Sequence, residues 1–439
     1  MRVNSILRNV LLLNLAALLL AVYAAAQAGQ LDPTFGTGGI FVAPTGKSAT
    51  NAVAIQSDGK IVIAGVGLVD NPPIFADTII RLNTNGTLDT SFGTGGVVNL
   101  NPPGIGNDGG FFGMAIQADG KIVAAAAGVS TVQTSAAMVA RVESNGSLDT
   151  SFGSGGFTTV LEFSAPGEIF SQGLALGPDG KIVMAVGATN PSLMARFTSS
   201  GQLDTSFGTG GLVNLQYAGP TRVAIQSNGK ILVTSNASGG FITAQAGAIT
   251  RYDSNGTVDA TFGGGGTAAS AASASALVLQ SDGKILVGGA ITSKVNPPQT
   301  ANDVGFGIIR YNPNGSLDST FGTKGVAVTD FGATATDSSA FALAVQSNGD
   351  VVAAGAAGIF FEETFTSNFG LARYTSAGAL DTTFGSDGIV ITNVRSTGDF
   401  VASQVNALAI QSDGKIVAAG TSVFDIEGEN GYVARYLGQ

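Results

Sequence analysis

One nine-residue motif recurs seven times along the chain and constrains its fold more than any other feature. It reads LDPTFGTGG from Leu31, LDTSFGTGG from Leu88, LDTSFGSGG from Leu148, LDTSFGTGG from Leu203, VDATFGGGG from Val258, LDSTFGTKG from Leu317 and LDTTFGSDG from Leu380. Successive copies start 57, 60, 55, 55, 59 and 63 residues apart. A repeat of this length is one supersecondary unit that buries its apolar face only by packing on its neighbours.

Each repeat predicts four short strands. A block such as AIQSDGKIV at Ala54 alternates apolar and polar residues up to an Asp-Gly or Asn-Gly pair, which is a strong hairpin signal. A later run, such as IIRYNPNG, contains one arginine and ends at another turn, and the run after the motif, such as GVVNL, supplies the fourth strand. We call these strands a, b, c and d. Four antiparallel strands repeated seven times predict an all-β fold, a seven-bladed β-propeller.

The order of strands at the two chain ends predicts how the ring closes. The first motif is followed by a d strand alone, whereas the last repeat supplies strands a, b and c and ends with YVARYLGQ. We expect the N-terminal strand to complete the last blade, as one N-terminal plus three C-terminal strands, and to cover its edge. The alternatives are a linear β-solenoid or a ring of six or eight blades.

The first residues of the chain predict export. Arg2 and Arg8 precede an apolar run from Val10 to Val22, and an A-x-A sequence follows at Ala26-Gln27-Ala28. This pattern predicts a signal peptide over residues 1–28 and one propeller over 29–439. The alternative is an uncleaved membrane anchor, for which the run is short, because a span needs about 20 apolar residues. We expect a periplasmic, cell-surface or extracellular protein with no membrane span after cleavage.

Composition argues against several classes of partner and chemistry. Without the two arginines of the leader, 18 basic and 30 acidic residues remain, a net charge of −12. Nucleic acid and anionic membrane both need a basic patch, so neither is an expected partner. The chain has no cysteine and no histidine, which removes disulfides, thiolate metal sites and the commonest general base. No cofactor is predicted; Ca²⁺ stays open as an alternative, although no calcium-loop motif supports it, and the sequence identifies no metal.

An aspartate and an arginine recur in every repeat. The aspartates are Asp32, Asp89, Asp149, Asp204, Asp259, Asp318 and Asp381, and the arginines are Arg81, Arg141, Arg196, Arg251, Arg310, Arg373 and Arg435. A residue present in every blade is most simply required by the blade. We expect the aspartate to cap the turn between strands c and d, the following Phe to fill the space between blades, and the arginine to bind a carboxylate or a turn carbonyl. The alternatives are a ring of metal-binding carboxylates and an anion site.

Antiparallel strands place the connections of each blade on opposite faces of the disc. The a–b and c–d turns form what we call the constant face, and the b–c and d–a connections form the variable face. Most variation lies on the latter, at 67–77, 101–111, 161–171, 291–307, 358–370 and 421–431. Loops on a rigid scaffold commonly carry binding, so acidic and aromatic residues there are candidate ligand-binding residues. They are Asp70, Phe75, Asp77, Glu162, Glu168, Phe360, Phe361, Glu362, Glu363, Asp425, Glu427 and Glu429. The alternative is that they are solvated loop residues without a function.

The paired blocks LDTSFGTGG and AIQSDGKIVIAG, at this spacing, resemble the delta-60 repeat family of exported bacterial proteins. The resemblance covers nearly all of the chain after the leader and implies a β-propeller fold and export. The family has no established activity, so the resemblance implies no catalytic residue. The leading hypothesis is a non-catalytic propeller that binds a protein or glycan through the variable face. The alternatives are a polysaccharide hydrolase or lyase that uses a carboxylate pair, and a purely structural envelope protein.

Overall fold

The computed structural model describes fourteen segments of the chain. They are residues 28–44, 48–69, 74–100, 110–129, 135–163, 171–187, 192–217, 219–236, 247–292, 304–332, 337–361, 364–395, 401–424 and 430–438. Within these segments the regular elements are all β-strands. No helix in them has the length and apolarity needed to cross a membrane.

Four sheets of four antiparallel strands follow one another along the chain. The first has β2 (Ala49–Ile55), β3 (Ile61–Val69), β4 (Ile74–Leu82) and β5 (Val97–Leu100), and the second has β6 (Phe111–Ile116), β7 (Ile122–Val129), β8 (Ser135–Val142) and β9 (Phe157–Phe163). The third has β10 (Ser171–Leu176), β11 (Ile182–Gly187), β12 (Leu193–Phe197) and β13 (Leu212–Asn214), and the fourth has β14 (Pro220–Ile225), β15 (Ile231–Asn236), β16 (Gly247–Tyr252) and β17 (Thr267–Ser270). Strand order equals chain order in each sheet, so consecutive connections alternate between two faces.

A fifth sheet of twelve strands consists of three similar groups. They are β18 (Ala276–Leu279), β19 (Ile285–Thr292), β20 (Val304–Tyr311) and β21 (Val326–Thr329); then β22 (Asp337–Val345), β23 (Val351–Phe361), β24 (Thr364–Tyr374) and β25 (Ile389–Thr392); and finally β26 (Val401–Ile410), β27 (Ile416–Phe424) and β28 (Asn430–Tyr436) with β1 (Ile40–Val42). Adjacent groups are joined through the single parallel pairs Val304–Asp337 and Ser367–Ala402. Within each group the strands are antiparallel, as in the separate sheets.

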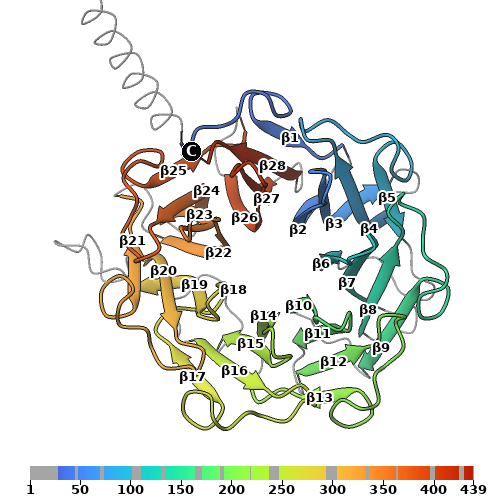
Figure 1. Ribbon diagram of the computed structural model, residues 1–439. Helices are drawn as coiled ribbons and strands as arrows, with labels where there is room; N and C mark the ends of the chain where they lie inside the picture. Colours follow the sequence, from blue (N-terminus) through green and yellow to red (C-terminus); the bar gives the residue numbers. More distant parts are fainter. Residues whose placement is uncertain are drawn as a thin grey trace, which may run out of the picture.

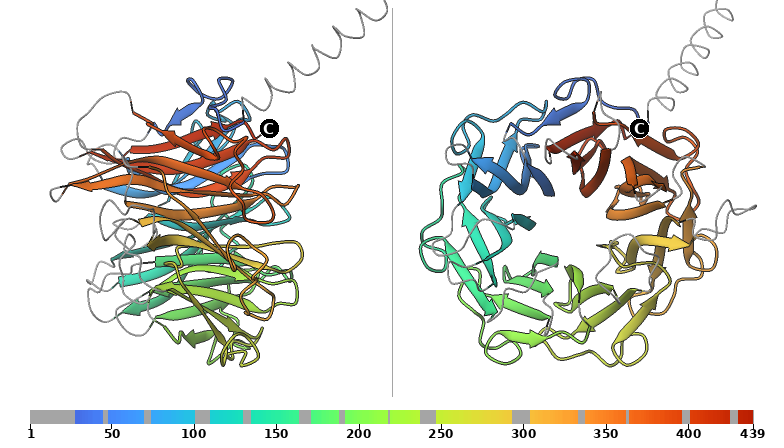
Figure 2. Two further views of the ribbon diagram at one scale, coloured as in Figure 1. Left: turned by 90° about the vertical axis from the view of Figure 1, so that its left-hand side faces the viewer. Right: turned by 180° about the vertical axis from the view of Figure 1, so that it is seen from behind.

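The groups surround a central opening. Figure 1 shows β2, β6, β10, β14, β18, β22 and β26 at its inner rim, and Figure 2 shows from the side that the assembly is a disc. The N-terminal strand β1 pairs with β28 near the other end of the chain, with Ile40 opposite Ala434. The first and the last described strands therefore belong to the same four-stranded group, as the order of strands in the sequence predicts.

The apolar core lies between neighbouring sheets. Phe92, for example, is fully buried in a cluster that combines Val62 and Ile79 of the first sheet with Ile122 and Met138 of the second. The phenylalanine of every motif lies in such a cluster at 0% exposure: Phe35, Phe92, Phe152, Phe207, Phe262, Phe321 and Phe384. Each motif thus supplies the side chain that seals one junction between sheets.

Some connections predicted as loops are largely strand. The segment 358–370 belongs to a hairpin in which β23 and β24 pair as far as Phe361 opposite Thr364. The segment 67–77 likewise lies mostly in β3 and β4, which pair out to Val69 opposite Ile74. These extensions lack the Asn-Gly turn that marks the other hairpins, so composition alone suggests a loop. On the variable face, b–c hairpins therefore extend further than the sequence indicates.

Ala28 and Gly29 belong to the folded ring. Ala28 is 2% exposed, and its carbonyl accepts a hydrogen bond of 2.8 Å from the Gly385 N–H. The Gly29 N–H donates to the Leu437 carbonyl at 2.8 Å. The Asn145 carbonyl, which is equivalent to that of Ala28, likewise accepts the Gly93 N–H at 2.9 Å. The residue at the end of the expected leader therefore takes a regular place in the fold.

Candidate functional site

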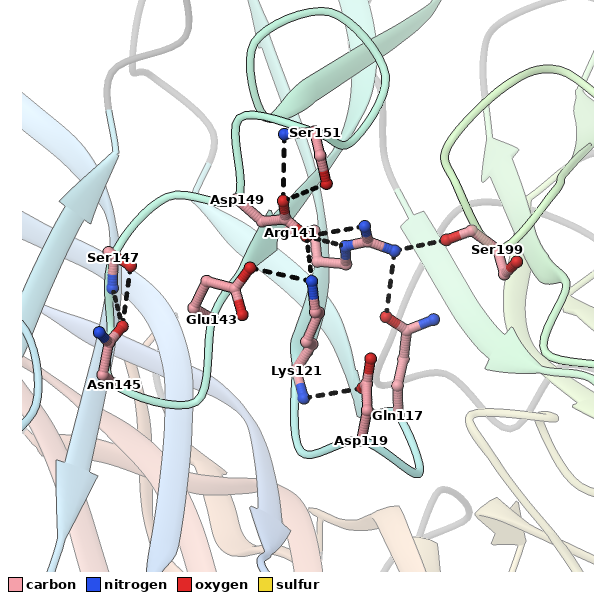
Figure 3. A network of polar contacts seen from close by, with 10 residues as sticks. All are labelled: Gln117, Asp119, Lys121, Arg141, Glu143, Asn145, Ser147, Asp149, Ser151 and Ser199. Carbon is pink, nitrogen blue, oxygen red and sulfur yellow. Dashed lines mark hydrogen bonds and ion pairs between the residues drawn. The ribbon is translucent and has the colours of Figure 1, made fainter.

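The recurrent aspartate and arginine meet in a polar network, which Figure 3 shows for the second repeat. Arg141 Nε donates to Asp149 Oδ2 at 2.7 Å, and Lys121 Nζ donates to the same oxygen at 2.7 Å. The other oxygen, Oδ1, caps its own turn by accepting the Ser151 N–H at 3.1 Å and the Ser151 hydroxyl. Asp149 thus serves two cations and one turn at once. We call the aspartate, arginine, lysine and motif phenylalanine of a repeat its clasp.

Each clasp also connects its repeat to the next one. Arg141 Nη1 donates to the Ser199 carbonyl in the following repeat, and the guanidinium carbon lies 4.6 Å from the centre of the Phe152 ring. The corresponding carbonyls in the other repeats belong to Thr84, Ser144, Ser254, Pro313, Ser376 and Gly438. Arg435 bonds to Thr84, so the last repeat is joined to the first in the same way. Arginine suits this role because its planar fork binds several partners while its face stacks on a ring.

The clasp keeps its aspartate ionised. Burial by itself raises the pKa of Asp149, but the bonds from Lys121, Ser151 and Arg141 outweigh it and hold that pKa well below its usual range. The pKa of Asp89 is lowered in the same way, with Ser91, Lys60 and Arg81 opposing burial. A carboxylate that is satisfied by two cations and a turn has little capacity left for a ligand.

The sixth clasp differs from the rest. Lysines bind the aspartate in six repeats, at Lys60, Lys121, Lys181, Lys230, Lys284 and Lys415. The equivalent position in the sixth repeat is Asp350, which accepts a hydrogen bond of 2.7 Å from Asn348. Asp381 therefore keeps Arg373 but has no lysine, and its side chain is 15% exposed against 4% for Asp149.

Asp77 is the one predicted ligand-binding residue whose side chain the structure describes. It lies on β4, four residues before Arg81, and is 2% exposed. Burial raises its pKa to about 7, although a hydrogen bond from the Gly110 backbone acts in the opposite direction. Its Oδ1 has no hydrogen-bond partner. At the same position the second repeat has Ala137 and the sixth has Phe369, so the blade does not require a carboxyl group there.

The other predicted residues are placed only in part or not at all. Phe75 lies in β4, Glu162 in β9, and Phe360 and Phe361 in β23, where only the backbone is described. Asp70, Glu168, Glu362, Glu363, Asp425, Glu427 and Glu429 lie outside the described residues. Among the described residues, no three carboxylates gather as a metal-binding group.

Surface depressions occur beside the clasps. One of about 530 Å³, between the last and first repeats, is lined by Asp58, Asp413, Lys415 and Arg435. Another of about 260 Å³, between the third and fourth repeats, is lined by Asp179, Lys181 and Arg196 among others. Both belong to junctions that recur around the ring on the constant face. Their arginines and lysines are engaged in the clasps, whereas the side chains of Asp58, Asp179 and Asp413 are more than half exposed.

Comparison with known families gives a direct match. Residues 56–92, 117–152, 177–207, 226–262, 280–321 and 411–437 match the model of DUF5122, a domain of unknown function described as a beta-propeller. The match supports a propeller repeat family. The first five segments run from the a–b turn of a repeat into the following motif and contain all four clasp residues, and residues 411–437 contain Lys415 and Arg435 of the last clasp. No curated protein matches the chain.

Solved structures that match the chain include several enzymes. A catalytically inactive virginiamycin B lyase from Staphylococcus aureus with quinupristin has 13% identity and a TM-score of 0.45, over 90% of this chain and 98% of the other. An α-L-arabinofuranosidase from Fusarium graminearum has 9% identity and a TM-score of 0.42, over 89% and 93%. An exo-β-1,3-galactanase from Clostridium thermocellum has 12% identity and a TM-score of 0.34, over 91% and 96%. At these similarities none of them transfers a function.

Proposed function

We propose that this chain is an exported, seven-bladed, non-catalytic propeller of the delta-60 type that binds a protein or glycan through its variable face. The ring of clasps is the structural part of the molecule. One observation supports this division: the constant face repeats the same buried polar network, whereas Asp77 is a buried carboxyl group that only one repeat has. A residue that the fold does not require is free to serve a ligand.

The extended hairpin of β23 and β24 offers the sharpest test of the binding face. Ala357 pairs with Asn368, so replacing residues 358–367 with Asn-Gly closes the hairpin in register. Binding of the purified protein to an immobilised panel of polysaccharides is measured for the wild type and this variant. We expect the variant to keep cooperative unfolding and lose the binding that the wild type shows.

The matched control changes the constant face. Asp282 lies in an a–b turn with its side chain 57% exposed, and D282A should leave binding unchanged. Equal loss of binding in D282A, or retained binding in the shortened hairpin, would count against the variable face as the binding face. Loss of folding in the shortened hairpin would instead overturn the division between scaffold and binding parts.

A hydrolase or lyase has one observation in its favour. Asp77 has a pKa of about 7, which is the range a general acid or base needs at neutral pH. Glycoside chemistry requires a second carboxyl group, about 5 to 10 Å away. Among the described residues, no charged group contributes to the pKa of Asp77. Release of reducing sugars that D77N abolishes would establish the enzyme; equal release by D77N would remove Asp77 from it.

Export implies a particular cleavage point. Cleavage after Ala28 would remove a buried residue and the acceptor of the Gly385 N–H bond. We propose that the leader is removed before Ala28. An A-x-A sequence also ends at Ala26, so cleavage there would begin the mature chain at Gln27 and preserve the junction. Mass spectrometry of the exported protein is expected to show residue 27 or 28 first; a chain that starts at Gly29 would contradict this.

A further inference from the structure

Arg222 occupies a position that is small in all the other repeats. It lies on the inner strand β14, eight residues before Lys230 of the a–b turn. The equivalent residues are Ala52, Gly113, Gly173, Ala276, Ala342 and Ala407. A small side chain therefore suits this position of the blade. The presence of an arginine in the fourth repeat is not explained by the blade itself.

The side chain reaches across the central opening. Arg222 Nη2 donates to the Phe341 carbonyl on β22 at 3.0 Å and to the Asn406 carbonyl on β26 at 3.5 Å. Nη1 donates to the neighbouring Thr221 carbonyl at 2.9 Å. Figure 1 shows β14 at one side of the opening and β22 and β26 at other parts of its rim. The guanidinium thus lies within the central channel.

β-Bulges supply the carbonyl groups that hold it. Strand register shifts between Ala340 and Ala342, between Val405 and Ala407, and between Pro220 and Arg222. Phe341, Asn406 and Thr221 are the extra residues at these three shifts. A bulged residue leaves the ladder, so its carbonyl is free to accept another donor. Three inner strands therefore fix the guanidinium in one place.

The charge of Arg222 has no counter-charge in the described protein. None of the described carboxylates forms an ion pair with it, and burial alone acts on its pKa, which is lowered. Its Nε–H makes no hydrogen bond to a described residue, yet the side chain is still partly exposed. Buried charges are normally paired, and carbonyl groups supply position without supplying a negative charge.

We propose that Arg222 is an anion-binding site in the central channel, which takes the carboxylate of the ligand that binds the variable face. The part of this proposal that names the variable face rests on the proposed function, whereas the anion site itself does not. Strand a runs from the variable face towards the constant face, and Arg222 is the third of the six residues of β14, so it lies in the half of the strand nearer the variable face. A carboxylate that accepts the Nε–H would form a charge-assisted bond and balance the charge.

The first test uses formate as the probe. The midpoint of thermal unfolding is followed as sodium formate replaces the sodium salt of a bulky sulfonate buffer at constant ionic strength. We expect a saturable rise for the wild type and none for R222M. K324M removes one exposed positive charge elsewhere and should respond like the wild type. An equal rise in R222M, or no saturable rise in the wild type, would show that Arg222 is only a structural tie.

A second measurement needs no variant and covers the case in which R222M fails to fold. In this measurement chloride is the probe, and the width of its chloride-35 NMR line reports exchange with the wild-type protein. We expect the line to narrow as formate displaces chloride from Arg222. An unchanged line width would overturn the site. A galacturonate oligosaccharide and its neutral galactose counterpart then distinguish a free small anion from an acidic ligand. Stabilisation by the acidic oligosaccharide but not by the neutral one supports the ligand carboxylate; stabilisation by formate alone limits the site to small free anions and overturns that part of the proposal.

Failure of this site and failure of the proposed function give different results. If formate has no effect while the shortened β23–β24 hairpin still loses polysaccharide binding, only the anion site is wrong. If formate stabilises the wild type through Arg222 while hairpin shortening leaves binding unchanged, the anion site holds and the binding face is wrong.

Discussion

The clasps and the central channel hold arginine in opposite ways. Arg141 is buried beside Asp149, stacks on Phe152 and recurs in every repeat, so its charge is balanced where it lies. Arg222 is held by carbonyl groups alone and occurs once. Asp77 resembles Arg222 in being a charge-bearing group without an opposite charge beside it among the described residues. In a repeat protein, a buried charge that is paired and repeated indicates scaffold, whereas one that is unpaired and unique indicates a site.

The largest effect is expected from removing a clasp arginine, because the comparison treats these arginines as part of the scaffold. R141A leaves Lys121 as the only cation beside Asp149, loses the bond to Ser199 and opens space beside Phe152. Breaking a buried pair from one side costs about 3 to 5 kcal/mol of unfolding free energy. Urea denaturation measures it. R373A should cost at least as much, because Asp381 has no lysine; a loss below about 1 kcal/mol in both would contradict a scaffold role.

The next largest effect is the pH dependence of the unfolding free energy that Asp77 causes. Its folded pKa of about 7 lies above its unfolded value of 3.8, so protonation favours the fold. This stability is fully present below pH 3.8 and is lost as pH rises through about 7. The loss amounts to about 4 kcal/mol between pH 4 and pH 8, and D77N should not show it. Denaturation at several pH values compares the two proteins; parallel profiles would contradict a buried, unpaired Asp77.

A milder change tests the phenylalanine of the clasp. F152L removes the aromatic face on which Arg141 stacks and leaves a small void in a fully buried position. We expect a loss of about 1 to 2 kcal/mol. F207L should cost a similar amount, because Arg196 lies 4.5 Å from its ring centre. Urea midpoints of the two variants measure this, and very unequal losses would show that the clasps are not equivalent.

The smallest effect is expected from adding the missing lysine to the sixth clasp. D350K places a lysine where six other repeats have one, at the position equivalent to Lys284, which binds Asp318 at 3.0 Å. The gain should be about 0.5 to 1 kcal/mol, because these lysines are partly exposed. K284D is the matched reverse change and should lose a similar amount. No gain in D350K with a clear loss in K284D would mean that the sixth junction is built differently.

Much of the scaffold could be predicted because its signals are local and repeated. The turn pairs, the alternation of the strands and the seven motifs all indicate four-stranded units, and sheet order in the structure follows chain order. The motif glycines adopt positive φ, for example 53° at Gly93 and 63° at Gly95. The lysine of the clasp is not among the predicted residues, although its recurrence in the a–b turns, as in SDGK, is a signal for it.

The candidate site could be predicted much less well. Asp77 was singled out as a loop residue, but it lies buried in β4, because the hairpin continues past the segment that composition marks as a loop. Arg222 was not singled out, since nothing in PTRVAIQSNGK shows that its side chain enters a channel. Alignment of the repeats, with Ala or Gly at six equivalent positions, contains the signal.

By itself the sequence determined the repeat, the strands, the turns and the residues that every blade shares, because these depend on contacts between residues close in the chain. The tertiary structure alone decided which groups from distant repeats meet. Arg222 contacts Phe341 and Asn406, 119 and 184 residues away, only because closure of the ring brings inner strands around one channel. Burial by residues distant in the sequence shifts the pKa values of Asp77 and Arg222. No local pattern encodes these neighbours, so only the folded chain shows that the two groups lack an opposite charge among the described residues.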